Sequence, residues 1–195
     1  MHRPDVSRAL ASFPLLDDVI ALTRISLATR DLSRRVQLLS EGMSGLLGTR
    51  HEIPDGFFVP DPGRYRRHLL ADGGSAGYQV LLMTWGPGQG TDIHDHGGTW
   101  GVESVLHGAL DITEYELQDE DGSCAELSVA RRRRLEAGQS LGLLPPGDLH
   151  ACRNASKCDV ALSLHVYGEA VDQVRTFQST SHARYRVVQH SPVVA

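Results

Sequence analysis

The chain has 195 residues, of which 41% are hydrophobic, and its formal net charge is −5. This size is enough for one domain with a core but not for two large domains, and the weak negative charge does not favour nucleic acid as a partner. No apolar run approaches the roughly 20 residues that cross a bilayer, so the sequence predicts no membrane segment.

The first part of the chain predicts helices. Within DLSRRVQLLSEGMSGLLG, apolar residues recur at spacings of three and four, at Leu32, Val36, Leu39, Met43 and Leu46. Asp31 or Ser33 can cap the start of this helix, and Gly48 can end it. We expect residues 1–50 to form an N-terminal helical segment that packs on the rest of a single domain.

From about residue 55 the pattern changes to short apolar runs between turn residues. Examples are YQVLLMTW, DITEYEL and CDVALSLHVYG, with turns such as GPGQG and PPGD between such runs. Several short strands separated by turns predict an all-β sandwich or barrel, which we assign to residues 51–195. The end of the chain, residues 178–195, is expected to be a loosely held tail.

The cysteine content indicates a reducing compartment. Cys124, Cys152 and Cys158 make an odd count without a C-x-x-C motif, which fits the cytosol better than a disulfide framework. The N-terminus also lacks the charged-then-apolar order of a signal peptide. We therefore expect a cytoplasmic location.

Two histidines stand close together in TDIHDHGG. In a strand, His94 and His96 share one face while Asp95 points to the other, so both imidazoles can reach one point. The pair alone fits a metal clamp and an exposed polar pair equally well.

A second motif, LPPGDLHACRN, brings His150 after a tight turn, with Asn154 four residues later. The pattern G-x5-H-x-H that ends at His96, followed by P-x-G-x2-H-x3-N, resembles the two metal motifs of the cupin superfamily. This resemblance implies an all-β cupin jelly-roll barrel, here with an N-terminal α-helical segment, and a metal held by His94, His96 and His150.

Most cupins add a glutamate ligand where this chain has Trp100 and Gly101. The resemblance therefore implies a ligand set of three neutral imidazoles with further coordination positions open. Imidazole suits iron, zinc, copper and nickel, so these ligands alone do not select the metal.

The segment ALSLHVYG puts Ser163, His165 and Tyr167 on one face of a strand. The simpler interpretation is an alternating strand whose polar face meets solvent. If the strand instead lines a metal cavity, the three side chains can form a chain of hydrogen bonds that holds the phenol near the metal.

Three histidines without the glutamate, together with S-x-H-x-Y, resemble the cysteine dioxygenase family of thiol dioxygenases. YRRHLL and WGPGQGTDIHDH are similar to further segments of that family, and the similarity runs from about Tyr65 to Tyr167. The resemblance implies an Fe(II) enzyme that adds both atoms of O2 to the sulfur of a small thiol carboxylate, most directly converting L-cysteine to cysteine sulfinate.

The resemblance also implies roles for individual residues. Arg67, with Tyr65 nearby, would bind the substrate carboxylate, which a guanidinium can contact through both oxygens. Tyr167 would be catalytic, with its position fixed through His165 and Ser163.

The identity of the thiol stays open. Arg67 favours cysteine, whereas HDHGGTWGV and HVYGEAVDQVR look more like bacterial relatives that oxidise 3-mercaptopropionate. Arg175 is either a second carboxylate partner or a surface charge. Two arginines near the site would also permit a dicarboxylate thiol such as mercaptosuccinate.

Glu103 is unusual, because relatives carry an apolar residue at this position. It would meet the ammonium group of cysteine, pair with an arginine such as Arg67 or Arg175, or lie at the rim of the cavity. A buried carboxylate is costly without a partner, so if Glu103 is buried we expect it to have one.

Two other functions remain as alternatives. One is a different cupin enzyme, such as a metal-dependent isomerase or a dioxygenase of non-thiol substrates. The other is a non-catalytic cupin sensor or binding module, which the open coordination positions disfavour because structural metal sites are usually closed. The sequence does not fix the oligomeric state.

Overall fold

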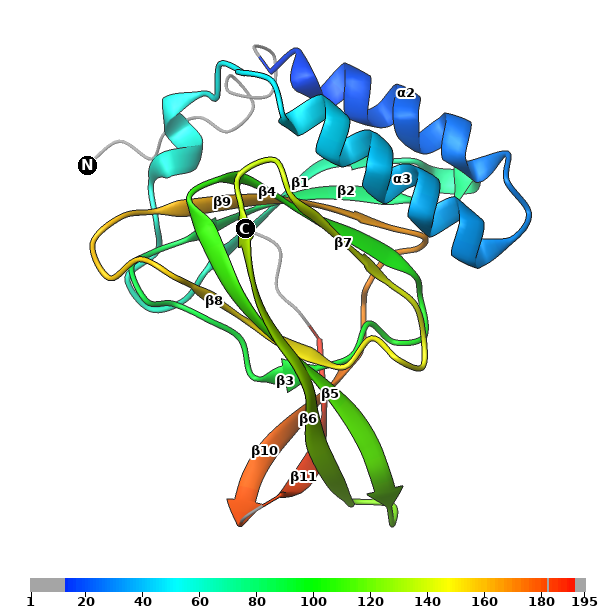
Figure 1. Ribbon diagram of the computed structural model, residues 1–195, viewed down its shortest axis with the longest axis vertical. Coiled ribbons are helices and arrows are strands. Elements are labelled where there is room, and N and C mark those ends of the chain that lie inside the picture. The colour runs from blue at the N-terminus through cyan, green and yellow to red at the C-terminus, as the bar shows by residue number, and fades with distance from the viewer. Residues whose placement is uncertain (1–12, 182, 192–195) are drawn as a thin grey trace.

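The computed structural model describes residues 13–181 and 183–191. Within them, two α-helices precede eleven strands that form two facing sheets (Figure 1). Two short 3-10 helices, η1 (Asp55–Phe58) and η2 (Gly74–Ala76), lie in the connections. The expected all-β barrel with an N-terminal helical segment is confirmed.

The two helices are α2 (Leu15–Leu27) and α3 (Leu32–Leu47). The caps of α3 are as predicted: the Asp31 side chain accepts a hydrogen bond from the backbone N–H of Arg34 at 2.7 Å, and Gly48 is the C-cap. The remainder of the predicted helical segment, residues 1–12, lies outside the described residues.

The buried stripe of α3 differs from the prediction at its two ends. Leu32 is 38% exposed, and Leu47 is buried where Leu46 was expected. The middle of the stripe, Val36, Leu39 and Met43, is buried as predicted. A step of four residues from Met43 to Leu47 keeps the contact on one helix face, because 3.6 residues make one turn.

The first sheet has five strands, all antiparallel to their neighbours. In spatial order they are β1 (Arg66–Asp72), β2 (Gln79–Trp85), β9 (Ala161–Tyr167), β4 (Gly101–His107) and β7 (Ser140–Leu143).

The second sheet has six strands and closes on itself, because its last strand pairs with its first. Their order is β10 (Val174–Ser181), β11 (Arg184–His190), β6 (Cys124–Glu136), β5 (Ala109–Glu120), β8 (His150–Asn154) and β3 (Ile93–His94).

The prediction of a loosely held tail over residues 178–195 is wrong for its described part. β10 and β11 pair over most of their length, and β10 also pairs with β3. The polar side chains of this segment concealed the two strands, but Tyr185 and Val187 of β11 pack against the small core that contains Ile93 and Phe177. Paired backbone groups and these inward apolar side chains hold the segment in place.

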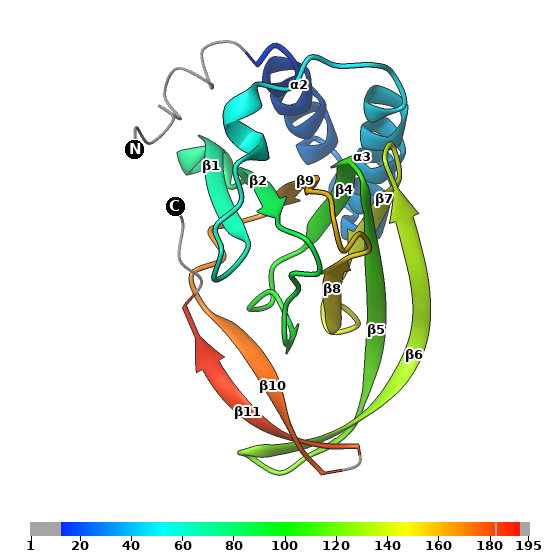
Figure 2. The same ribbon diagram turned by 90° about the vertical axis from the view of Figure 1, so that its left-hand side faces the viewer.

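Both faces of the first sheet are covered. Side chains alternate along each strand, so Val80 and Leu82 of β2 pack with the helices, while Leu81 and Met83 point into the barrel. Figure 2 shows α2 and α3 lying along the outer side of this sheet. As a result, all seven residues of β9 are buried, including the polar ones.

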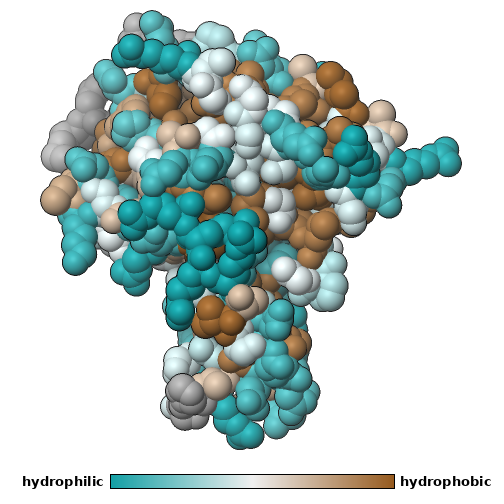
Figure 3. Space-filling view, in the orientation of Figure 1, coloured by the Kyte–Doolittle hydropathy of each residue, from teal (hydrophilic) through white to brown (hydrophobic). Residues whose placement is uncertain are grey.

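The long strands of the second sheet project beyond the barrel. The outer ends of β5 and β6 and the hairpin of β10 and β11 form an arm, which Figure 2 shows from the side. In Figure 3 the tip of this arm is mainly hydrophilic, and hydrophobic side chains show where it joins the body. Among the described residues, no helix is long and apolar enough to cross a membrane.

The Asn154 side chain hydrogen-bonds to the backbone of two segments that flank the candidate site, the end of β2 and the turn after β8. Its side-chain Nδ2 donates to the carbonyl oxygens of Trp85, Gly86 and Asp159 at 3.0, 3.1 and 2.8 Å. Its Oδ1 accepts from the backbone N–H of Ser156 at 2.9 Å. A buried amide with every polar atom bonded fixes the end of β2 against the end of β8.

We expect Asn154→Ala to lower the free energy of unfolding by about 2–4 kcal/mol, because buried carbonyl groups lose their donor. Urea unfolding followed by circular dichroism measures this loss. Gln118→Ala, which removes an exposed side-chain amide, is the control and should change stability little. Equal stability of the Asn154→Ala variant and the native chain would contradict this role.

Candidate metal centre and its cavity

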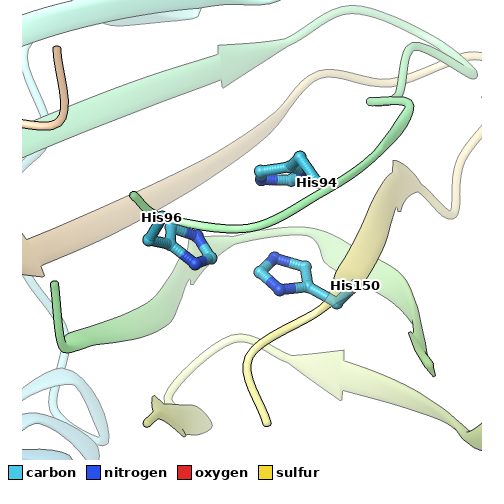
Figure 4. Close-up of side chains that lie close together, drawn as sticks. All are labelled: His94, His96 and His150. Atoms are coloured by element: carbon cyan, nitrogen blue, oxygen red, sulfur yellow. The ribbon is translucent and has the colours of Figure 1, made fainter. Parts of the chain in front are cut away.

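Three histidines converge at one point inside the second sheet. His94 lies on β3 opposite His150 at the start of β8, and His96 follows two residues after β3. Figure 4 shows their rings turned toward a common centre. One ring nitrogen from each lies within 4.8 Å of the others, which is the spacing of ligands around one metal ion.

The hydrogen bonds of these histidines determine which nitrogen faces the centre. Nδ1 of His94 lies 3.0 Å from the Asp92 carbonyl oxygen, and Nδ1 of His150 lies 2.9 Å from the Asp148 carbonyl oxygen. Nδ1 of His96 lies 2.9 Å from the Asp148 carboxylate. Since these oxygens only accept, each Nδ1 carries a proton, and in the neutral ring each Nε2 offers a lone pair.

The buried Nε2 atoms of His96 and His150 have no hydrogen-bond partner in the part of the chain that the structure describes. Burial lowers the pKa of His94 and His96, and neighbouring imidazoles lower both further. Burial would also lower the pKa of His150, but the adjacent Cys152 and Glu103 outweigh it and hold this pKa well above its usual value. Neutral imidazoles with free lone pairs are the form that binds a metal. The donor set therefore fits a divalent transition-metal ion.

Asp95 points away from this centre, as the strand pattern predicted. Its carboxylate accepts from Arg175, at 2.8 Å from the backbone N–H and at 2.6 Å from Nε. The Arg175 guanidinium also donates to Glu120 at 3.0 Å. Arg175 is thus occupied by two carboxylates and does not line the cavity, so the structure corrects its assignment as a carboxylate partner of the substrate.

A cavity of about 470 Å³ opens beside the histidines. His94, His96 and Tyr167 line its inner part. The guanidinium of Arg67 is buried there, and its Nε and Nη1 have no partner among the described residues. An unpaired buried guanidinium is costly unless an anion meets it, so this arrangement is suited to a carboxylate ligand.

Other side chains complete the wall of this cavity. Tyr65 stacks on Trp85 with ring centroids 4.6 Å apart and lies beside Arg67 in the lining. The lining also contains the charged side chains of Arg64, Arg153 and Asp92, together with His190. Arginines thus outnumber carboxylates around the cavity, which favours an anionic ligand.

The polar face of β9 forms a continuous chain of hydrogen bonds. The indole Nε1–H of Trp85 donates to Ser163 Oγ at 2.8 Å, and Ser163 Oγ lies 2.7 Å from His165 Nε2. His165 Nδ1 lies 3.1 Å from the Tyr167 hydroxyl. The interpretation in which this face meets solvent is therefore wrong, because all seven residues of β9 are buried.

Tyr167 reaches the cavity at the end of this chain. Burial raises the pKa of its phenol well above the usual value, and the Glu103 carboxylate raises it further. The phenol is therefore protonated at neutral pH and can act as a hydrogen-bond donor. Gly101 lies opposite Tyr167 in the adjacent strand, and a Cβ there would come within 2.8 Å of the phenol ring, so a larger residue would require the ring to shift.

Glu103 is buried and has partners, but they are not arginines. Its Oε1 lies 3.3 Å from His150 Nε2 and 3.2 Å from His165 Nδ1, and its Oε2 accepts from the Cys152 thiol at 3.5 Å. Burial alone would raise the pKa of Glu103, but the two imidazoles outweigh it and hold this pKa well below its usual range. The predicted pairing with Arg67 or Arg175 is absent among these contacts, and Glu103 does not line the described cavity.

Three features of the site were not predicted. The Asp148 carboxylate holds His96 from 52 residues away, and Trp85 donates to Ser163 from 78 residues away. Arg153 lines the cavity from the strand that carries His150. Asp148 stands two residues before His150, and a carboxylate beside a metal-binding histidine is a common pattern that could have drawn attention to it.

The family model and the curated relatives that match this chain indicate the same family. Residues 51–180 match the family described as Cysteine dioxygenase type I. Cysteine dioxygenase type 1 of Rattus norvegicus and that of Homo sapiens are each 31% identical to this chain over 123 residues, which is 63% of the chain. The match spans 60% of the length of each of these relatives.

Similarity to solved structures is weaker. A protein with a double-stranded beta-helix domain from Klebsiella pneumoniae has a TM-score of 0.47 and 18% identity, covering 67% of this chain and 99% of its own. The protein TT1209 from Thermus thermophilus has a TM-score of 0.46 and 20% identity, covering 62% of this chain and 98% of its own.

We expect Asp148→Asn to weaken metal binding about 10–100-fold, because His96 loses the charged acceptor that orients its ring. Competition with a chromogenic chelator for Zn(II) or Co(II) measures the affinity. Asp111→Asn, which alters an exposed ion pair with Arg134, is the matched control and should bind metal like the native chain. Unchanged affinity in the Asp148→Asn variant would show that this carboxylate does not support the site.

Proposed function

Because the chain belongs to the cysteine dioxygenase type I family, we propose that it is a thiol dioxygenase. The proposed reaction adds both atoms of O2 to the sulfur of a small thiol carboxylate and gives a sulfinate. The observation that carries the proposal is the combination, in one cavity, of three converging imidazoles with a buried guanidinium that lacks a partner within the described chain.

The proposed cofactor is Fe(II), held by His94, His96 and His150. When bound there, Fe(II) supplies a Lewis acid for a thiolate and a redox partner for O2. The three-imidazole set fits this ion, although it also fits other first-row metals, so the choice of iron comes from the family.

The side chains of the cavity have separate roles in the proposed reaction. Arg67 binds the carboxylate of the substrate and thereby fixes the direction in which the thiol points. Tyr167 keeps its proton at neutral pH and donates a hydrogen bond toward the occupant of the cavity. Tyr65 stacks on Trp85 in the wall and narrows the access of water. The unpaired cysteines are compatible with the cytoplasm, which we propose as the location.

We propose L-cysteine as the substrate, with cysteine sulfinate as the product, because Arg67 offers one buried site for one carboxylate. A second candidate is a thiol with two carboxylates, such as mercaptosuccinate, which the additional arginines Arg64 and Arg153 in the lining favour. A third is 3-mercaptopropionate, which lacks an ammonium group. An ammonium group, which cysteine has, would need an acidic partner. In the described cavity lining that partner is the Asp92 carboxylate, because Glu103 does not line the cavity.

The test is O2 uptake by protein that has been loaded with Fe(II) without air. Cysteine, 3-mercaptopropionate and mercaptosuccinate are compared in parallel, and sulfinate is quantified by mass spectrometry. We expect O2 uptake that equals sulfinate formation with at least one thiol, and the highest kcat/KM identifies the substrate class.

Iron bound at one ion per chain without uptake for any thiol would overturn the proposal. The family relationship would then extend to the scaffold and not to the reaction. Another metal-dependent reaction, or ligand sensing without catalysis, would become the better explanation of the cavity.

We expect Tyr167→Phe to lower kcat by about 10-fold or more while iron content stays the same, because the phenol donates to the reacting groups and does not bind the metal. Iron analysis and O2 uptake on the same preparation measure both quantities. Tyr185→Phe, which removes a hydroxyl on β11 outside the cavity, is the control. A parallel loss of iron in the Tyr167→Phe variant would contradict the assigned role.

A further inference from the structure

The buried carboxylate of Glu103 has no part in the roles described above. It contacts neither the cavity nor a guanidinium, and it lies within the barrel between two imidazoles, those of His150 and His165. In the register of the first sheet, Glu103 on β4 stands directly opposite His165 on β9. Its position beside the hydrogen-bond chain of β9 therefore follows from strand pairing.

The contact between Glu103 and His165 requires a donor. A carboxylate accepts hydrogen bonds and cannot donate one, and Glu103 Oε1 lies 3.2 Å from His165 Nδ1. The contact is favourable only if His165 Nδ1 carries the proton. In a neutral imidazole, His165 Nε2 is then an acceptor.

The hydrogen bonds at the other end of the β9 hydrogen-bond chain, at Trp85 and Ser163, indicate the same tautomer. The indole N–H of Trp85 can only donate, so Ser163 Oγ accepts it at 2.8 Å. Ser163 is fully buried, and its own proton needs an acceptor, which His165 Nε2 supplies at 2.7 Å. If His165 Nε2 were protonated, Ser163 would receive two donors and its own proton would have no acceptor among its described contacts.

The tautomer of His165 determines where the phenol proton of Tyr167 points. The Tyr167 hydroxyl lies 3.1 Å from His165 Nδ1, the nitrogen that already carries a proton. The phenol oxygen therefore accepts in this contact, and the phenol proton is free to point elsewhere. Tyr167 lines the cavity, so the proton is directed toward its contents.

We propose that Glu103 is a positioning residue that acts with Ser163 to hold His165 in the Nδ1–H tautomer and thereby keeps Tyr167 a hydrogen-bond donor into the cavity. The consequence for catalysis rests on the proposed dioxygenase function, whereas the tautomer itself does not. With an apolar side chain at position 103, the Tyr167 hydroxyl could instead donate to His165 Nδ1 and turn its proton away from the cavity.

The first experiment measures the tautomer directly. Zn(II)-loaded protein labelled with ¹⁵N in its histidine rings is studied by NMR, in which protonated and unprotonated ring nitrogens have well-separated shifts. The His165→Gln variant identifies the His165 signals. We expect a protonated Nδ1 and an unprotonated Nε2 in the native chain. A protonated Nε2 with an unprotonated Nδ1 would overturn the proposal, whatever the outcome with thiols.

Two substitutions separate the acceptor from its charge. Glu103→Gln keeps an oxygen that can accept from His165 Nδ1, so we expect the same tautomer and a kcat within about twofold of the native value. Glu103→Leu removes one of the two groups that favour the Nδ1–H form, so we expect a detectable fraction of the Nε2–H tautomer and a lower kcat, with KM and iron content retained. Equal loss in both variants would overturn the proposal, because the negative charge rather than the acceptor would then matter.

A double-mutant cycle tests whether Glu103 acts through Tyr167. We expect Glu103→Leu to lower kcat in the native background but to change it by no more than about twofold when Tyr167→Phe is already present. The same fold-loss in both backgrounds would contradict the proposal and indicate a direct effect on the metal centre. Glu116→Gln, on an exposed part of β5, is the control for loss of a carboxylate. If no thiol supports O2 uptake, the dioxygenase proposal fails while the NMR result still stands.

Discussion

The geometry of the site depends on a strand of only two residues. Backbone pairing over two residues cannot fix β3 by itself, because strands of globular proteins usually need more residues to be stable. β3 is held from both sides, by β8 through the pair of His94 with His150 and by β10 through the pair of His94 with Thr176. The ion pair of Asp95 with Arg175 adds a third attachment. Convergence of the three imidazoles follows from these contacts.

The interior of the barrel is unusually polar for a core, and its polar groups are arranged in one connected set. Glu103 contacts His150 of the three converging histidines on one side and His165 of the β9 hydrogen-bond chain on the other. A buried carboxylate on its own would cost several kcal/mol, so its place between two imidazoles is what makes it tolerable. A divalent ion on His150 would stabilise the same charge. The three converging histidines and the hydrogen-bond chain that ends at Tyr167 are therefore electrostatically linked.

The sequence predicted those parts of the site that depend on local spacing. His94 with His96, and Ser163 with His165 and Tyr167, follow from the two-residue repeat of a strand, and the fold class follows from the short runs between turns. The partners of Glu103 could not be predicted, because they depend on the register between β4 and β9.

The structural role of β10 and β11 could not be predicted for a similar reason. Arg175 carries no local sign that its partner is Asp95, 80 residues earlier in the chain. Composition indicated a loosely held tail from residue 178 onward, although Tyr185 and Val187 pack against the small core that contains Ile93 and Phe177. Single-sequence patterns report which face a residue occupies along its own strand, but not which strand lies next to it.

The late position of β10 in the chain has a consequence for biosynthesis. The residues of β3 emerge from the ribosome long before the strand that anchors them, so His94 and His96 have no fixed geometry in the nascent chain. Contacts between segments so far apart in sequence form slowly, since a long loop must close first. A chain interrupted before Val174 would therefore carry all three histidines but lack the strand that orients them.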